Sequence, residues 1–341
     1  MTPPIAQKKL NKKLNLIYTS DDQPGFFRRK WGKGFRYLDD KNNKLDDDKS
    51  LVRIKKLVIP PTWEDVWICK KDNGHLQSTG RDGRKRKQYI YHPEWTAYRQ
   101  AEKFSKLLEF AVALADMRKT IAGNLAKKRW DREKVLSLAV KIMDEHNIRI
   151  GNQQYAEKNG TYGLTTLRRK HIDLDTKELT FSYKAKSNKH RNVSITNPRL
   201  IKLIKQCSEL PGYEVLTYKD KSGQSQSIDS SDVNEYIQKI MGEAFSSKDF
   251  RTWGGTSLAV KYYENALALV AENPRKKIEP SLVKMVAKSL GNTMSVCRKY
   301  YIHPLVLEQI KEGKPDWNVN RKDRKWMKGY EIETQRVLRN V

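Results

Sequence analysis

Residues 94–126 read EWTAYRQAEKFSKLLEFAVALADMRKTIAGNLA, and this stretch separates two kinds of sequence. Its apolar residues recur at the spacing of one face of an α-helix. The residues before it instead show short β-rich runs, LVIP at 57–60, DVWIC at 65–69 and QYIYH at 88–92, between segments rich in turn-forming residues. We therefore expect a β-rich N-terminal domain at residues 1–95 and a second domain at residues 96–341.

Helical periodicity continues through most of the second domain. The segment DREKVLSLAVKIMDEHNIRIG at 131–151 begins with Asp131, a favourable N-cap, and ends at Gly151, a favourable stop. The segment ELTFSYKAKSNKHRNVSIT at 178–196 alternates apolar and polar residues around an SNKH turn, which predicts a β-hairpin. A final charged helix is expected near residues 324–340. The pattern predicts an α+β fold, with a small β-rich N-terminal domain and a larger, mostly α-helical domain that contains the hairpin.

The charge of the chain points to a polyanionic partner. There are 68 Lys and Arg residues against 40 Asp and Glu residues, a net charge of +28 that is spread along the whole sequence. Such self-repulsion disfavours a compact state unless counter-charge is supplied. DNA or RNA is the leading partner, because each phosphate contact releases condensed counterions. A ribosome-associated protein, or one that is merely very basic, is the alternative.

Neither membrane nor metal signals are present in the sequence. No apolar run approaches the roughly 18 to 20 residues that cross a bilayer, and the N-terminus lacks an apolar stretch of signal-peptide length. We expect an intracellular protein, cytoplasmic and associated with a nucleoid or else viral. Cys69, Cys207 and Cys297 have neither disulfide nor zinc spacing. Cys297 lies close to Tyr301, but a structural role is favoured over a nucleophilic one.

A basic and aromatic segment, GRDGRKRKQYIYH at 80–92, is a candidate nucleic-acid contact. In a strand, Tyr89 and Tyr91 share one face and can touch base edges, while Arg86 and Lys87 hold phosphates. The alternatives are a nuclear-localisation-like cluster, or a solvated sheet edge whose tyrosines pack inward.

Cleavage of a phosphodiester without a metal requires a nucleophile, a proton donor and fixed positive charge for the non-bridging oxygens. Arg149 lies in an apolar frame, so it is expected to be partly buried and either paired with an acid or reserved for an anion. The sequence has no HExxH, P-loop or glycine-rich nucleotide motif and no carboxylate cluster at metal spacing. A mechanism free of metal and ATP is therefore the natural one to test.

The segment LGNTMSVCRKYYIHPLVLE at 290–308 contains two adjacent tyrosines, Tyr300 and Tyr301, either of which is a reagent or a packing residue. Neighbours on a helix diverge by about 100°, so both phenols cannot face one phosphate. Asn292 and Tyr301 are nine residues apart, on opposite sides of an unbroken helix. We therefore expect a break or mobile loop between them, near Ser295.

Eight segments in order resemble the type IB DNA topoisomerases of the small poxvirus and bacterial class, and the bacterial branch most. They are SDDQPG, GKGFRYLD, IPPTWEDVWIC, NGHLQSTGRDGRKRKQYIYHPEW, RIGNQQYAEKNGTYGLTTLR, DVNEYI, KDFRTWGGT and LGNTMSVCRKYYIHP, which fall within roughly residues 15–310. The resemblance implies the fold shared by tyrosine recombinases and type IB topoisomerases. It also implies relaxation of supercoiled DNA by transient single-strand cleavage through a 3′-phosphotyrosyl intermediate and religation, without ATP or metal.

The resemblance also implies roles for individual residues. Tyr301 matches the nucleophile, and Tyr300 occupies a position that is usually small. The groups implied at the scissile phosphate are Arg149, Arg251 and Asn292, the last as a hydrogen-bond donor. Lys186 matches the general acid of the hairpin, with Lys184 as the alternative because the glycines of the family pattern are Ala185 and Asn188 here. The expected DNA contacts are Arg84, Arg86, Gln88, Tyr89, Tyr91, Tyr155 and Lys248.

Two other functions compete with this one. A tyrosine recombinase-like strand transferase has a similar catalytic apparatus, but recombinases usually carry histidine three residues before the second arginine, where this chain has Lys248. A non-enzymatic DNA-packaging or RNA-binding protein accounts for the charge but not for the ordered set of arginines and Tyr301. We expect a monomer that binds double-stranded DNA and needs no obligate protein partner, no cofactor and no metal.

Overall fold

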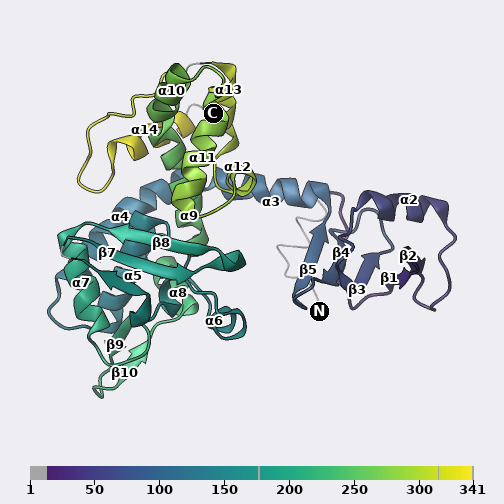
Figure 1. Cartoon of the computed structure of the whole chain (residues 1–341), viewed down its shortest axis with the longest axis horizontal. Coiled ribbons are helices and arrows are strands. Elements are labelled where there is room, and N and C mark those ends of the chain that lie inside the picture. The colour runs from purple at the N-terminus through teal and green to yellow at the C-terminus, as the bar shows by residue number, and fades with distance from the viewer. Residues whose placement is uncertain (1–13, 176, 314, 340–341) are drawn as a thin grey trace. The chain divides into compact units, whose positions relative to one another are not determined.

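The computed structural model describes residues 14–175, 177–313 and 315–339 (Figure 1). The chain forms two compact units that divide between Lys103 and Phe104. The boundary expected near Trp95 lies inside α3 (Pro93–Ser105), the helix that contains this division. Each unit is considered by itself.

The first unit is an antiparallel sheet with one flanking helix. In its described part, five strands are arranged in the order β2-β1-β3-β4-β5. These strands are β1 (Gly25–Trp31), β2 (Gly34–Leu38), β3 (Glu64–Cys69), β4 (Leu76–Arg81) and β5 (Lys87–Tyr91), and the helix is α2 (Asp48–Lys56). Apolar side chains of β1, β3 and α2 form the core, including Phe26, Ile54 and Ile68.

The segment at 57–60, expected to be β-rich, does not join this sheet. It follows α2 as a turn, and its carbonyls bond to a side chain instead of to a strand. The Arg28 guanidinium donates to the carbonyl oxygens of Ile59 at 2.9 Å and Pro60 at 2.8 Å. The strand prediction is therefore wrong here, because a buried arginine from β1 takes the backbone acceptors that a ladder would use.

The second unit is mostly helical and contains the predicted hairpin, so the α+β class is confirmed. Its helices are α4 (Leu107–Ala126), α5 (Arg132–His146), α6 (Gln153–Asn159), α7 (Pro198–Ser208), α8 (Ser230–Met241), α9 (Ser247–Lys261), α10 (Tyr263–Glu272), α11 (Ile278–Leu290), α12 (Met294–Tyr300), α13 (Pro304–Glu312) and α14 (Gly329–Arg339). Its strands are β6 (Ile172–Leu174), β7 (Leu179–Lys184), β8 (His190–Ile195), β9 (Thr217–Lys219) and β10 (Ser225–Ser227). The final helix begins at Gly329, later than the expected 324.

Helix α9 joins two apolar clusters of this unit. Phe250 and Trp253 pack in a cluster with α4, α5 and the inner face of β7 and β8. Val260, from the last turn, packs in another cluster with residues of α11, α12 and α13, such as Cys297. Because it is buried on most sides, α9 offers a rigid support for any side chain that leaves it toward a site.

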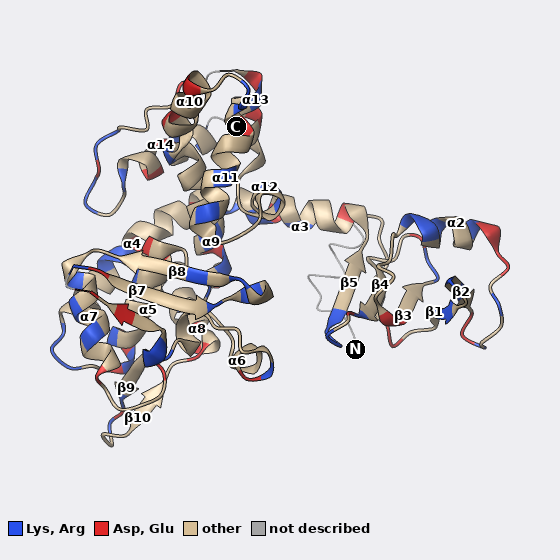
Figure 2. Cartoon of the chain, in the orientation of Figure 1, with Lys and Arg blue, Asp and Glu red and all other residues tan. Residues whose placement is uncertain are grey.

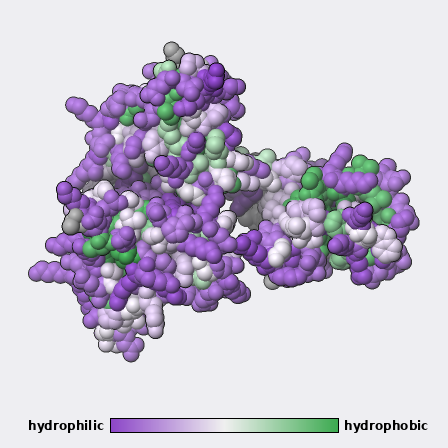
Figure 3. Space-filling view, viewed as in Figure 1, coloured by the Kyte–Doolittle hydropathy of each residue, from purple (hydrophilic) through white to green (hydrophobic). Residues whose placement is uncertain are grey.

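The surface is strongly polar. Figure 3 shows that hydrophilic residues dominate the displayed face of the second unit. The ribbon near the free end of the β7–β8 hairpin is coloured for Lys and Arg residues (Figure 2). Among the described residues, no helix combines the length and the apolar character that a bilayer crossing demands.

Candidate active site

Arg149 lies on a backbone segment that is held in place by two glycines. Helix α5 ends at Asn147, which has a left-handed φ of 53°, and the chain then passes Arg149 to reach Gly151. Gly151 and Gly163 pack backbone to backbone, since a Cβ on Gly163 would lie 2.5 Å from the Cα of Gly151. The amide of Leu164 donates to the carbonyl of Arg149 at 2.8 Å. The position of the Arg149 side chain therefore depends on a close approach that a larger residue would prevent.

Arg251 projects from the first half of α9 and is only 4% exposed. Its guanidinium donates to the carbonyls of Asn147 and of Leu290, the latter at 2.9 Å, and lies 5.1 Å from the ring centre of Tyr301. Burial, and then the positive charge of Arg149, lower the pKa of Arg251 to about 10, while Tyr301 acts in the opposite direction. The group therefore keeps its charge at neutral pH.

Arg149 and Arg251 place two positive charges close enough to influence each other. Arg149 donates to the side-chain oxygen of Asn292, and within the described ranges neither Arg149 nor Arg251 pairs with a carboxylate. Like charges held together in a poorly solvated place are costly unless an anion neutralises them. This arrangement suits a phosphate group.

Asn292 lies at the break between α11 and α12. Gly291 ends α11 with a left-handed φ of 60°, and the hydroxyl of Thr293 accepts from the amide of Val296 at 3.3 Å to begin α12. The break was expected near Ser295, and that position is wrong, because Ser295 lies in the first turn of α12. The amide nitrogen Nδ2 of Asn292 is buried without a hydrogen-bond partner among the described residues.

Tyr301 and Tyr300 differ in their surroundings. Tyr301 ends α12, its amide donates to the carbonyl of Cys297 at 2.9 Å, and its carbonyl accepts from the Thr256 hydroxyl at 3.2 Å. Its ring faces Arg251. Tyr300 is 40% exposed, and the Lys299 ammonium lies 5.3 Å from its ring centre. Tyr301 is therefore the phenol that lies with the arginines.

Cys297 is close to these groups but is a packing residue. Its side chain is fully buried in the cluster of α11, α12 and α13, and it is a free thiol. Burial raises the pKa of the Cys297 thiol, while Arg251 and the Asn292 amide act in the opposite direction. A thiol of raised pKa that solvent does not reach is a poor nucleophile.

The lysine expected as the general acid lies on the β7–β8 hairpin. Lys186 begins the turn between β7 and β8, in which Ser187 and Asn188 have left-handed φ values of 65° and 59°. Lys186 and Lys184 are both exposed, and in the described part of the chain neither bonds to Arg149, Arg251, Asn292 or Tyr301. The structure thus brings together four of the five expected catalytic residues and leaves the fifth on the hairpin.

In the first unit, Asp82 organises the turn before β5. It accepts from the amide of Arg84 at 2.9 Å and from the Gln88 side chain at 2.9 Å, and its carboxylate lies 2.6 Å from Arg86. The Arg86 hydrogen bond is the main reason that the pKa of Asp82 falls to about 2. Sequence reasoning missed Asp82, although an Asp-Gly pair in a basic segment is a turn signal.

The tyrosines of β5 are turned outward rather than packed inward. Tyr89 is 49% exposed and Tyr91 is 41% exposed, and their rings stack with centres 6.0 Å apart. The other expected DNA contacts lie in the second unit, where Tyr155 on α6 is 58% exposed and Lys248 on the first turn of α9 is also exposed. All of these side chains are accessible to a large ligand.

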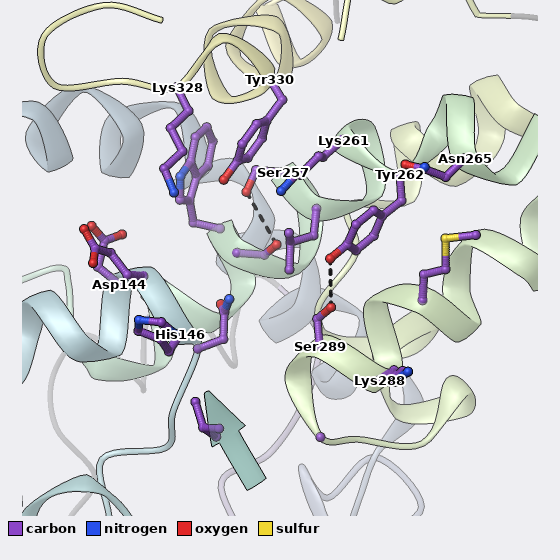
Figure 4. Close-up of a pocket in the computed structure, with 18 of the residues that line it drawn as sticks. Asp144, His146, Ser257, Lys261, Tyr262, Asn265, Lys288, Ser289, Lys328 and Tyr330 are labelled. Carbon is purple, nitrogen blue, oxygen red and sulfur yellow. Dashed lines mark hydrogen bonds between the residues drawn. The ribbon is translucent and has the colours of Figure 1, made fainter. Parts of the chain in front are cut away.

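A cavity of about 1020 Å³ lies along one side of α9 (Figure 4). Gly254, Ser257 and Lys261 line it, whereas Gly255 and Thr256 contact Tyr301. The hydroxyl groups of Tyr262 and Ser289 are hydrogen-bonded at 3.0 Å along its wall. Tyr301, Arg149 and Asn292 do not line this cavity, so the candidate active site is a separate feature.

Comparison with known families shows to which family the chain belongs. Residues 86–327 match the eukaryotic DNA topoisomerase I catalytic core, and residues 34–82 match the bacterial DNA topoisomerase IB N-terminal domain. The chain belongs to the type IB DNA topoisomerase family. The resemblance and the enzyme class inferred from the sequence are confirmed, and helix α14 lies beyond the region that this family match covers.

Individual relatives agree with this assignment. The DNA topoisomerase 1B of Acanthamoeba polyphaga mimivirus is 30% identical over 306 residues, which is 88% of this chain and 91% of that protein. The DNA topoisomerase 1B of Vaccinia virus (strain Copenhagen) is 24% identical over 280 residues, which is 79% of this chain and 85% of that protein. The XerH site-specific recombinase bound to its difH substrate is a distant structural similarity, with 16% identity, a TM-score of 0.35 and coverage of 59% of this chain and 51% of that one.

We also searched the structure for side chains that could hold a metal ion. In the portion of the type IB topoisomerase that the structure describes, no group of three or more His, Cys, Asp and Glu residues is gathered as a metal site requires.

Proposed function

We propose that this type IB topoisomerase relaxes supercoiled DNA by transient cleavage of one strand, with Tyr301 as the nucleophile, and reseals it without ATP or metal. The observation that carries the proposal is the grouping of a phenol with two guanidinium groups that have no carboxylate partner in the described ranges. Such a group binds a phosphate and places a nucleophile beside it.

In the first step, the Tyr301 oxygen forms a bond to the scissile phosphorus and loses its proton to solvent water. The bond from phosphorus to the 5′ oxygen breaks, and that oxygen takes a proton from the Lys186 ammonium, or from Lys184 as the alternative. Arg149 and Arg251 stabilise the negative charge that grows on the non-bridging oxygens, and Asn292 donates a hydrogen bond to one of them.

The intermediate is a 3′-phosphotyrosyl ester with a free 5′-hydroxyl on the same strand. Because one ester replaces another, the bond energy is kept, and the reverse reaction reseals the strand without an energy source. While the strand is open, the free end rotates and the supercoil relaxes.

Each unit is proposed to bind the duplex through its own exposed residues. In the first unit, residues 1–95 form the clamping domain, and the contacts are Arg84, Arg86, Gln88, Tyr89 and Tyr91. In the catalytic domain, residues 96–341, Tyr155 and Lys248 contribute. Stacked and exposed tyrosines beside arginines support this assignment, since the aromatic edges reach bases while the cations hold phosphates. The protein is proposed to act as a monomer, without an obligate protein partner, on a nucleoid or on a viral genome.

The proposal is tested by trapping the covalent adduct. Wild-type protein is incubated with a supercoiled plasmid that carries no special site, in excess EDTA and without nucleotide, and the reaction is stopped with detergent. We expect relaxation and a covalent protein–DNA adduct for the wild type and for the matched control Tyr300→Phe. We expect neither for Tyr301→Phe.

Three outcomes contradict the proposal. Adducts that persist in Tyr301→Phe would show that another group is the nucleophile. Complete loss of wild-type activity in EDTA would reject the metal-free mechanism, and a strict need for paired recognition sites would favour a recombinase.

A further inference from the structure

Arg191 on β8 binds the ends of two helices at once. Its side chain is 9% exposed. In the described part of the chain, its guanidinium donates to four backbone carbonyls: Leu290 at 2.9 Å, Ser289 at 3.0 Å, His146 at 3.3 Å and Asn147 at 3.4 Å. These carbonyls lie at the C-terminal ends of α5 and α11, where intrahelical donors are lacking and the helix dipole favours a cation.

The same two helix ends support the candidate active site. Arg251 also donates to the carbonyls of Asn147 and Leu290. Asn147 is two residues before Arg149, and Leu290 is two residues before Asn292. The backbone segments that carry Arg149 and Asn292 are therefore both attached to Arg191.

The Arg191 guanidinium packs closely against the backbone at Gly291. Gly291 has a left-handed φ of 60°, and a Cβ there would lie 3.0 Å from a terminal nitrogen of Arg191. A planar guanidinium has five N–H donors in a fixed fork, so it reaches carbonyls of two helices together, whereas the compact ammonium of a lysine does not.

Arg191 also belongs to the hairpin that carries the expected general acid. It lies opposite Tyr183 of β7, and Lys184 lies opposite His190 in the same ladder. Lys186 is in the turn between these two strands. A movement of Arg191 relative to α5 and α11 would therefore move the lysine relative to the phosphate-binding side chains.

We propose that Arg191 is a positioning residue for strand cleavage. It holds the lysine-bearing β7–β8 hairpin against the segments that carry Arg149 and Asn292, so that proton donation to the leaving 5′ oxygen depends on it. This inference rests on the proposed function, because it concerns the proton that Lys186 or Lys184 supplies.

The test compares two leaving groups in single-turnover cleavage by Arg191→Lys, which keeps the positive charge but loses the fork. One DNA substrate has the ordinary 5′ oxygen at the scissile bond, and the other has a 5′ sulfur, which leaves without protonation. We expect cleavage of the oxygen substrate to slow by about 100-fold, the usual effect of misplacing a reacting group by about 1 Å. Cleavage of the sulfur substrate should stay within a few-fold of wild type, as it should for Lys186→Ala.

Arg28→Lys is the matched control. Arg28 is also buried, at 8% exposure, and it also donates to backbone carbonyls, those of Ile59, Pro60 and Trp63, but in the first unit. Arg28→Lys should lower the melting temperature of the protein, as Arg191→Lys should. It should leave the cleavage rate of both substrates unchanged. Equal losses of Arg191→Lys on both substrates, or no loss on either, would overturn the inference.

Hydrogen exchange on the free protein separates this inference from the proposed function. Arg191→Lys should speed exchange of the Ala185 amide, which donates to the Lys189 carbonyl at 2.7 Å. Arg28→Lys should not. Unchanged exchange in Arg191→Lys would reject the positioning role even if Tyr301 is the nucleophile. Adducts in Tyr301→Phe would reject the proposed mechanism whatever the exchange rates are.

Discussion

At the scale of single residues, Gly255 decides how close Tyr301 lies to helix α9. A Cβ at Gly255 would lie 2.6 Å from the carbonyl oxygen of Tyr301 and 2.9 Å from its Cβ. The next residue, Thr256, donates its hydroxyl to the same carbonyl at 3.2 Å. Since Arg251 is on the same helix, this contact sets the distance between the phenol and the guanidinium.

Replacement of Gly255 by Ala is predicted to displace Tyr301. The end of α12 has to move away from α9 to make room, and we expect the rate of adduct formation to fall by roughly 100-fold. The measurement is single-turnover cleavage followed by detergent trapping.

The control for this prediction is Gly123→Ala. Gly123 is an exposed residue in the interior of α4, and a Cβ there would meet none of the described atoms within 4 Å. This change should raise the free energy of unfolding by roughly 0.5–1 kcal/mol and leave cleavage unchanged. A Gly255→Ala protein that cleaves at the wild-type rate would show that α12 tolerates the shift.

At the scale of elements, the break between α11 and α12 brings Asn292 and Tyr301 to one place. An uninterrupted helix would direct the two side chains to opposite sides. Gly291 makes the turn in the left-handed region, and Thr293 starts the next helix as its N-cap. Helix α12 is only seven residues long, with Thr293 as its N-cap and Tyr301 as its C-cap. The order of the whole helix, and with it the position of Tyr301, therefore depends on the cap.

Thr293→Ala is predicted to fray α12. Loss of the cap should cost about 1 kcal/mol of stability, and cleavage should slow by roughly fivefold as the ordered form of the helix becomes less populated. Thermal unfolding and single-turnover cleavage measure the two effects.

Asn197→Ala removes a comparable cap at a distance from the site. Asn197 caps α7 by accepting from the Leu200 amide at 3.1 Å. It should reduce stability by a similar amount without changing the cleavage rate. If both variants slowed cleavage equally, the effect would reflect general stability rather than the α11–α12 junction.

At the scale of the whole molecule, positive charge is the main contribution to DNA binding. A net charge of +28 makes binding to DNA strongly dependent on salt, because each phosphate contact releases counterions. The basic residues are divided between the two compact units, and each unit has its own set (Figure 2).

Lys248→Gln in a Tyr301→Phe background is predicted to reduce the salt dependence of duplex binding. The slope of log K against log salt should become less steep by about 0.9, the contribution of one phosphate contact. Fluorescence anisotropy over a series of salt concentrations measures this slope, and the second substitution prevents cleavage.

Lys44→Gln provides the comparison for this measurement. Lys44 is highly exposed and pairs with Asp46 at 3.0 Å, so its removal should leave the slope unchanged. An unchanged slope for Lys248→Gln would remove Lys248 from the DNA contacts.

The kinds of elements and their order follow from local patterns. Helix α5 and the β7–β8 hairpin were both predicted from the spacing of their apolar residues, because burial of one face depends on residues that are close in sequence. The stop expected at Gly151 is wrong, since α5 ends at His146 and Asn147 caps it. The family also follows from short motifs in order. The exact place of the α11–α12 break and the non-strand at 57–60 were predicted wrongly, since a glycine conformation and a distant arginine decide them.

The grouping of side chains is a property of the tertiary structure alone. Arg191 and the Leu290 carbonyl are 99 positions apart, and Arg149 and Asn292 are 143 apart, so no local pattern records these contacts. The Arg191 contacts exist because the ends of α5 and α11 leave carbonyls unpaired, and because a glycine at 291 leaves room for the guanidinium beside them. Composition points to a nucleic-acid partner, whereas packing decides which phenol lies beside which guanidinium.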